Sequence, residues 1–349
     1  MACDQQQLDR LLAGPDNRAL GQPPQEAADP PSPLWPKLLA VPGLLQAGPI
    51  EQLAIVERLG YHRAAAPYLG AVVQAGGLLG PCTGPLARRL GQCLLQGLQA
   101  GRCAVVLADA ELQAEPACSL TRQGRSGWRL DGRLSQVPGA CGADWLIVVA
   151  QGDGACRHLL AVPQPSPGLR RRDWHGLDGA RVSELRFEAV AIRPGQRLVL
   201  PGDAAARLQA LRLHIRLAWC AEALGVLQRL LEQAGASVGP GRVDPPLRRR
   251  LADMHLSLAQ ARALVSLVHA AGAAGPCERR LCSAQVAVLA AIGSIGPGAL
   301  LIDDARSSPG PPVWPFFGRA AQIAQCLGPP QPCLQRLAEL LDTPSGAGD

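Results

Sequence analysis

The spacing of apolar residues changes twice along this 349-residue chain, and that change limits its possible folds more than any other feature. Residues 34–98 follow a helical pattern with short breaks at glycine and proline. Residues 103–200 divide into short apolar runs at the spacing of a small antiparallel barrel or sandwich. From Asp203 onward the pattern is helical again. This order predicts an α+β protein with an antiparallel β region between two helical regions.

Three domains are expected from these changes: an N-terminal helical domain at 1–101, a middle β-domain at 102–201 and a C-terminal helical bundle at 202–349. A chain of this length can bury a large core. Hydrophobic residues make up 48% and charged residues 18%, which is typical of a globular protein. Aromatic residues make up only 3%, so we expect an aliphatic core.

The individual elements are expected as follows. A short first helix covers about Gln5 to Ala13, and two consecutive helices lie within 48–79. The expected strands share a short apolar run between turn residues and cover 104–107, 128–130, 145–150, 158–162, 182–187 and 197–200. The expected bundle helices cover 203–235, 246–272, 279–292, 314–326 and 333–341.

Residues 128–150, WRLDGRLSQVPGACGADWLIVVA, form the most informative segment. A tight polar turn, Leu130-Asp131-Gly132, precedes a stretch of small residues. That stretch runs through Ala143-Asp144 into the apolar residues 145–150. The order strand, turn, Gly/Pro/Ala corner and strand predicts a β-meander whose corner can approach a flat ligand closely.

Charge gives a weaker indication of function. The net charge of +6, from 34 basic and 28 acidic residues, is too small to indicate a nucleic-acid partner. A basic surface would suit an anionic, phosphate-bearing ligand, and a solvated surface is the simpler explanation. The same two interpretations apply to the arginine runs 170–172 and 248–250.

Twelve cysteines suggest disulfides, yet the N-terminal residues MACDQQQLDR lack the apolar region of a secretory signal. We therefore expect reduced, mostly buried thiols in a cytoplasmic protein. Cys277 and Cys282 lack the spacing and neighbours of a zinc site, so no metal is expected. No uninterrupted apolar stretch of about 18 residues is present, so we expect no membrane partner.

The segment 128–150 resembles the middle β-domain of the acyl-CoA dehydrogenases, where the corner lies against the flavin ring. Further segments resemble that family in the same order along the chain: EQLAIVERLGYHRAAAPYLGAVVQAGGLL, GLDGARVSELRFEAVAI, LADMHLSLAQARALV and SIGPGALLIDDARSSPGPPVWPFFGRAAQIAQCLG. The likeness covers most of the chain. It is strongest to the shortened bacterial branch that acts on CoA thioesters of steroid side chains, often as two unlike subunits sharing a flavin.

The resemblance implies an FAD-dependent oxidoreductase of lipid metabolism, with an acyl-CoA substrate and a second acyl-CoA dehydrogenase-like subunit in a heterotetramer. Residues with an implied flavin contact are Gln136, Val137 and Pro138 at the corner, Arg242, and Gly293 and Gly296. The two glycines are equally explained as the C-terminal cap of a helix followed by a turn. The arginine runs are the alternative site for coenzyme A phosphates.

The family oxidises its substrate with a glutamate that removes the α-proton while a hydride passes to the flavin. The resemblance aligns that glutamate with Ile215, next to the matching Arg216, and the alternative C-terminal position also lacks an acid. Glu222 and His214 are candidate substitutes, although an ion-pair residue and a helix-surface histidine are the simpler interpretations. Three hypotheses follow: a non-catalytic subunit of a flavin-dependent heteromer, a self-sufficient dehydrogenase with an unusual base, or a scaffold protein without flavin.

Overall fold

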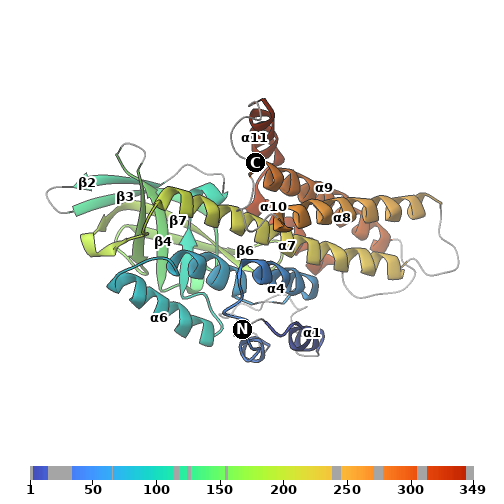
Figure 1. The fold of residues 1–349 in the computed structure, drawn as a ribbon, viewed down its shortest axis with the longest axis horizontal. Helices are drawn as coiled ribbons and strands as arrows, with labels where there is room; N and C mark the ends of the chain where they lie inside the picture. The colour runs from blue at the N-terminus through green and yellow to red at the C-terminus, as the bar shows by residue number, and fades with distance from the viewer. Residues whose placement is uncertain are drawn as a thin grey trace. The chain divides into compact units, whose positions relative to one another are not determined.

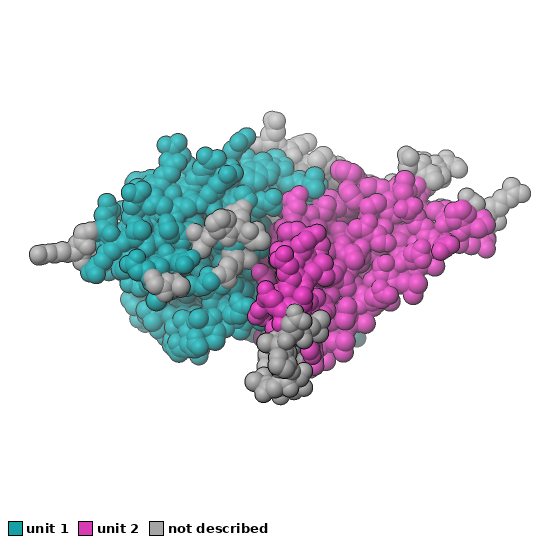
Figure 2. Space-filling view, turned by 90° about the horizontal axis from the view of Figure 1, so that it is seen from above, with its two compact units in different colours: residues 1–47, 65–215 teal, residues 48–64, 216–349 magenta. Residues whose placement is uncertain are grey.

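The computed structural model describes residues 3–14, 34–64, 66–113, 118–123, 127–153, 156–237, 245–270, 278–304 and 313–342. The chain forms two compact units, coloured separately in Figure 2. Unit 1 contains residues 1–47 and 65–215, and unit 2 contains residues 48–64 and 216–349. The sheet lies in unit 1 and the long helices lie mainly in unit 2 (Figure 1). The domain boundaries at 101/102 and 201/202 stay a prediction.

Unit 1 begins with short helices. They are α1 (Gln5–Ala13), α3 (Trp35–Leu39), the π-helix η2 (Tyr68–Gly76), α5 (Gly77–Leu79) and α6 (Pro85–Gln99). The Asp4 carboxylate accepts a hydrogen bond from the backbone N–H of Gln7 at 3.0 Å, which caps the N-terminus of α1. The helix begins at Gln5, as the sequence predicted. The buried Trp35 indole donates to the carbonyl of Leu98, so α3 is fixed to the end of α6.

The sheet of unit 1 is mixed. Its strands are β1 (Val105–Ala108), β2 (Cys118–Gln123), β3 (Gly127–Pro138), β4 (Trp145–Gln151), β5 (Arg157–Pro163), β6 (Leu169–His175), β7 (Arg181–Ile192) and β8 (Arg197–Leu198). Their order is β6-β7-β3-β2-β4-β5-β8, with β1 also paired to β4. The predicted antiparallel arrangement is therefore wrong in part, because β1 and β2 both pair in parallel with β4, one after the other along the same edge.

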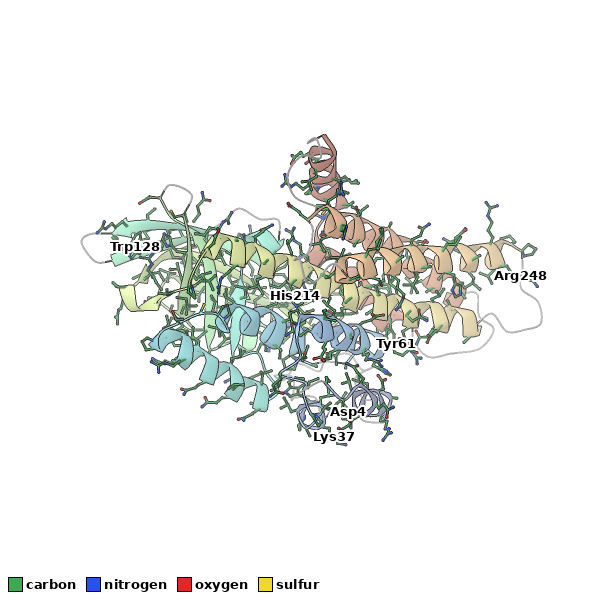
Figure 3. The ribbon with its side chains drawn as sticks, viewed as in Figure 1. Asp4, Lys37, Tyr61, Trp128, His214 and Arg248 are labelled. Carbon is green, nitrogen blue, oxygen red and sulfur yellow. The ribbon has the colours of Figure 1, made fainter. Side chains whose placement is uncertain are left out.

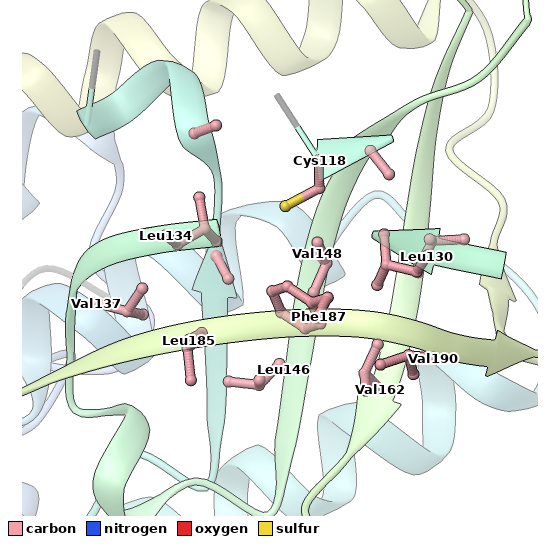
Figure 4. Packing of buried hydrophobic residues seen from close by; sticks show 14 of the residues in the cluster. Cys118, Leu130, Leu134, Val137, Leu146, Val148, Val162, Leu185, Phe187 and Val190 are labelled. Carbon is pink, nitrogen blue, oxygen red and sulfur yellow. The ribbon is translucent and has the colours of Figure 1, made fainter. Parts of the chain in front are cut away.

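The side chains of β3, β4, β5 and β7 enclose an aliphatic core (Figure 4). Phe187 is the one aromatic residue among the buried residues of this cluster, and it lies among Leu134, Leu146 and Val148. The sequence predicted β4 and β5 because each is a short, continuous run of buried apolar residues. Two strands were missed. The side chains of β6 are mostly exposed at the edge of the sheet, so β6 has no apolar run. Strand β2 has buried side chains only at Cys118 and Leu120, so it has no apolar run either.

The predicted tight turn at Leu130-Asp131-Gly132 is wrong, because β3 continues through it as a strand of 12 residues. A register shift in the β3–β7 pairing falls there instead. The Asp131 carboxylate accepts a hydrogen bond from the backbone N–H of Ala189, which has a φ of 55°. Gly132 has a φ of 151°, and a side chain on it would lie 2.7 Å from the sulfur of Cys118. Asp-Gly therefore marks a β-bulge, which uses the same residues as a turn.

Unit 2 is a bundle of α4 (Pro49–His62), most of α7 (Ala204–Ser237), α8 (Pro245–Ala270), α9 (Glu278–Asp304), α10 (Trp314–Leu327) and α11 (Pro330–Asp342). Helices α4 and α7 approach closely at two glycines. A Cβ on Gly60 would lie 2.3 Å from the carbonyl oxygen of Glu222, and one on Gly225 would lie 1.9 Å from that of Glu57. The Glu57 carboxylate also accepts a hydrogen bond from Arg262 of α8 at 2.7 Å.

Helix α9 is longer than predicted. It was expected to end at Ile292, but it continues to Asp304 and includes Pro297. Residues 278–302 are long and apolar enough to cross a membrane by length and composition, with 50% of the most apolar window buried. Helix α9 packs against α8, α10 and α11 of its own unit, which is what the core helix of a bundle does. We therefore interpret the apolar character of α9 as that of a helix in the core of the bundle.

Candidate functional site

The corner between β3 and β4, in unit 1, consists of a β-bulge followed by a turn. The β3–β7 pairing is interrupted between Leu134 and Val137, so Ser135 and Gln136 together oppose one residue of β7. Bulges of this kind are common beside active sites because they redirect side chains. Val137 is fully buried in the core, Gln136 is half-buried and Pro138 is exposed. Gly139 then turns the chain with a φ of 75° into the short 3-10 helix Ala140–Gly142.

Side chains from three elements hold this corner. The carbonyl of Ala140 accepts hydrogen bonds from Gln164 at 3.1 Å and from Arg171 of β6 at 3.5 Å. The carbonyl of Gly142 accepts one from Arg102 at 2.8 Å. Arg102 also forms a bidentate pair with Asp144, and this hydrogen bonding lowers the pKa of Asp144 below its ordinary value. The backbone of the corner is therefore held by hydrogen bonds from three separate segments of the chain.

The first three turns of α7 lie in unit 1 and include Ile215, which the resemblance aligns with the family's base. Arg212 donates to Asp109, at the end of β1, through Nε at 2.6 Å and Nη2 at 2.9 Å. Both residues are buried. This pair fixes the angle and register of α7 on the sheet. Three residues later Ile215 is fully buried. An aliphatic side chain accepts no proton, so Ile215 cannot act as a base at the position that the resemblance aligns with the family glutamate.

His214 is half-buried on the same turn of α7 (Figure 3). Burial lowers the pKa of its imidazole below the ordinary value, so the ring is neutral at pH 7. A neutral imidazole can accept a proton. The expectation of a simple surface histidine is incomplete, because the ring is partly buried.

Glu222 lies further along α7, in unit 2, and is buried. Its Oε1 accepts a hydrogen bond from Nε of Arg319 at 2.8 Å, and Nη2 of Arg319 lies 2.6 Å away. The ion-pair interpretation of Glu222 agrees with this contact. Oε2 has no hydrogen-bond partner among the described residues. Glu222 is thus held in place by Arg319 of α10.

Gly293 and Gly296, the two glycines with an implied flavin contact, have different surroundings in the structure. Gly293 and Gly296 lie inside α9, so neither a loop nor a helix cap forms there. Gly296 packs against Phe317 of α10, whose ring carbon would lie 3.0 Å from an added Cβ. Gly293 is exposed, and an added Cβ would meet nothing within 4 Å. Packing explains Gly296, whereas Gly293 offers bare helix surface. Arg242 lies outside the described residues.

The arginine runs are solvent-facing in the structure. Residues 170–172 form part of β6, where Arg170 pairs with Glu188 at 3.2 Å and Arg171 with Asp173 at 3.0 Å. Residues 248–250 are exposed near the start of α8. These contacts agree with a solvated charge run.

No family model matches this sequence. A curated relative, acyl-CoA dehydrogenase FadE27 of Mycobacterium tuberculosis, is 31% identical over 211 residues, which cover 57% of this chain and 54% of the relative. The match thus spans about half the length of that relative. The ChsE4–ChsE5 complex from the same organism has a subunit that matches 97% of this chain with a TM-score of 0.78 and 23% identity. The fold is that of the acyl-CoA dehydrogenases.

Further solved structures have the same fold. A variant of the Tcur3481–Tcur3483 steroid acyl-CoA dehydrogenase matches 97% of this chain and 96% of its own, with a TM-score of 0.74 and 21% identity. A glutaryl-CoA dehydrogenase from Mycobacterium smegmatis in complex with FADH2 matches 99% and 98%, with a TM-score of 0.72 and 16% identity. The family resemblance and the α+β fold predicted from the sequence are therefore confirmed.

Sequence reasoning missed the residues that support the site. Asp109 and Arg212 are 103 positions apart, and the clamp on the corner joins Arg102, Gln164 and Arg171 across several strands. No local pattern pairs such residues. A polar side chain within an apolar helical face was the available signal for Arg212.

Proposed function

We propose that this chain is a flavoprotein subunit for the α,β-dehydrogenation of an acyl-CoA thioester, and that it is the non-catalytic partner of a second acyl-CoA dehydrogenase-like subunit. The observation that carries the proposal is the fully buried Ile215, at the position that the resemblance aligns with the family's base. Glu222 supports it as well, because its carboxylate is already paired with Arg319.

The flavin would accept the hydride, as it does throughout this family. In this chain the corner is the best candidate to contact it. The backbone of Val137, the half-buried Gln136 and the exposed Pro138 would present a rigid surface to the flat ring system. The side chain of Val137 would take no part because it fills the core. Gly293 fits an approach of the flavin better than Gly296, whose Cα faces Phe317.

Two of the similar solved structures are complexes of unlike subunits, ChsE4–ChsE5 and Tcur3481–Tcur3483, and the second is named a steroid acyl-CoA dehydrogenase. These likenesses support a heteromeric partner. We therefore propose a heterotetramer, acting in the cytoplasm on a bulky acyl-CoA such as a steroid side-chain thioester.

The test is to purify the chain alone and co-expressed with each acyl-CoA dehydrogenase-like protein encoded beside it. The visible absorbance of oxidised flavin and acyl-CoA dehydrogenation are then measured in each preparation. We expect flavin and activity only in a co-purified complex. A yellow and active preparation of the single chain would contradict the proposal.

The alternative is a scaffold protein that reuses the fold without flavin. Gly296 favours it, because packing against Phe317 accounts for a glycine otherwise assigned to the cofactor. Colourless protein in every preparation would support this alternative. A self-sufficient enzyme that uses Glu222 would lose activity in Glu222→Gln, whereas our proposal expects the activity of the complex to stay unchanged, with circular dichroism confirming that the variant is folded.

A further inference from the structure

Helix α8 of unit 2 carries apolar side chains on two opposite sides. On one side, buried residues recur every three or four positions: Met254, Leu258, Ala261, Val265 and Val268. Exposed residues recur with the same spacing in a second stripe: Ala252, Leu256, Ala259, Ala263, Leu267 and Ala270. The two stripes are offset by two residues, which is about half a turn of an α-helix. The exposed stripe therefore faces away from the bundle that buries the first one.

This exposed stripe differs from an ordinary solvent-facing helix surface. Leu256 and Leu267 are 60% and 57% exposed, and about three turns of helix separate them. Among the described side chains from Leu256 to Ala270, the exposed ones are leucine, alanine, glutamine and serine, and none is charged. The half-buried Arg262 is paired with Glu57 of α4 at 2.7 Å. Single exposed leucines are common, but an aligned, charge-free stripe is typical of a surface that another chain covers.

The charges at the ends of α8 favour one direction for a helix that packs on this stripe. The exposed arginine run 248–250 lies near the N-terminus of α8, and its first member, Arg248, is labelled in Figure 3. The C-terminal turn of a helix carries partial negative charge on its carbonyl groups. A second α8 in the antiparallel direction brings each arginine run near the C-terminal turn of the other helix. In the parallel direction the two arginine runs would lie side by side and repel each other.

The stripe is also complementary to itself in side-chain size. A two-fold axis midway between positions 256 and 267 places Leu256 of one copy opposite Leu267 of the other, and the reverse. Gln260 then lies opposite Ala263, close to the axis. The small side chains of Ala259 and Ala263 allow the two helices to approach closely at their crossing. Two leucine pairs thus flank a crossing of small residues.

We propose that two copies of this chain associate through this stripe, with their α8 helices antiparallel about a two-fold axis. The contact needs neither flavin nor the unlike subunit, so it goes beyond the proposed function. A heterotetramer with two chains of each kind contains this chain twice, and the α8 contact would join those two copies. Colourless protein would contradict the proposed function and leave the contact between α8 helices intact.

The experiment is sedimentation velocity on the purified full-length chain over a range of concentrations. We expect a reversible dimer. Leu256→Lys introduces two charges into each dimer, because the two-fold axis repeats the substitution, and should raise the dissociation constant by about 100-fold or more. Leu267→Glu should have a similar effect. Leu95→Lys is the matched control, since Leu95 is 53% exposed on α6, and it should leave the dimer unchanged. Circular dichroism checks that each variant is folded.

The double variant Leu256→Lys/Leu267→Glu tests the direction of the two helices. In the antiparallel pair each introduced lysine lies opposite an introduced glutamate, so the double variant should recover at least about 10-fold of the lost affinity. In a parallel pair like charges would meet and no affinity would return. A monomeric parent chain, a dimer that Leu256→Lys leaves intact, or no recovery in the double variant would overturn the proposal. If the parent chain is monomeric and Leu256→Lys instead abolishes co-purification of the unlike subunit, that subunit covers the stripe.

Discussion

Arg212 and Asp109 form an ion pair that water scarcely reaches, with side-chain exposures of 5% and 1%. Substitution of Asp109 by Asn should leave the guanidinium charge buried without a counter-charge. We expect unit 1 to lose about 3–5 kcal/mol of stability, because an unpaired buried charge is costly. Urea unfolding followed by circular dichroism would measure this loss.

A matched control exists on the surface of the same unit. Arg170 and Glu188 are paired at 3.2 Å with side-chain exposures of 76% and 54%. Arg170→Gln should cost only about 0–1 kcal/mol, since solvent screens the pair. Equal losses in the two variants would contradict our interpretation of Asp109 as the anchor of α7.

We expect His214 to make the stability of the protein depend on pH. Its pKa is lowered by burial in the folded protein, so the unfolded chain binds the proton more readily. Both states are neutral above the unfolded pKa of about 6.5. As the pH falls below that value, the imidazole is protonated in the unfolded chain before it is protonated in the folded protein, and this favours unfolding. The loss of folding stability grows until the pH is below the pKa of the folded protein.

We therefore expect the melting temperature of His214→Gln to fall less than that of the parent protein when the pH is lowered from 7.5 to 5. Differential scanning calorimetry at both pH values measures the difference, and His255→Gln, at an exposed position, serves as the control. An unchanged pH dependence in His214→Gln would show that this imidazole takes no part.

At the scale of elements, two glycines in helix interiors should respond in opposite ways to alanine. Gly225→Ala places a Cβ 1.9 Å from the carbonyl oxygen of Glu57, so α4 and α7 must separate. We expect a loss of at least about 1–3 kcal/mol from overpacking. Gly293→Ala meets open space and should gain up to about 1 kcal/mol, because alanine favours helix.

Thermal unfolding of both variants tests this contrast, and Gly293→Ala also tests the site. If a flavin lies against α9 at Gly293, the added methyl should weaken flavin retention in the complex while the protein becomes more stable. Destabilisation by Gly293→Ala would contradict the open environment of this residue.

Element by element, the sequence predicted what depends on local periodicity. It gave α1 and the bundle helices α7, α8, α10 and α11 to within a few residues. It misjudged β3, α9 and β6 for separate physical reasons. An Asp-Gly pair stabilises a bulge as well as a turn, and two glycines within α9, Gly296 and Gly298, pack closely against Phe317 and Met254. An exposed edge strand carries no apolar pattern.

At the scale of the whole molecule, residues 48–64 belong with a bundle that begins more than 150 positions later. Tyr61 donates a hydrogen bond to Glu232, and Glu57 accepts one from Arg262. Helix α4 is therefore expected to share the stability of unit 2 and not that of residues 34–47, which precede it in the chain.

Hydrogen exchange in Gly225→Ala would test this assignment. We expect the amides of α4 and of the second half of α7 to lose protection together, while β3 and β7 retain theirs. Gly97→Ala is the reciprocal variant, because its Cβ would lie 2.4 Å from Cβ of Ala104 in unit 1. It should reduce protection in α6 and β1. Loss of protection across both units in either variant would contradict the division.

The sequence by itself determined the order of helices and strands, the family resemblance, and the absence of a glutamate at Ile215. These depend on local spacing and on residue type, which can be read along the chain. Only the tertiary structure decided that Glu222 pairs with Arg319 and that Asp109 anchors α7. Each of these contacts joins residues from different elements, and their partners are selected by packing and burial and not by sequence distance.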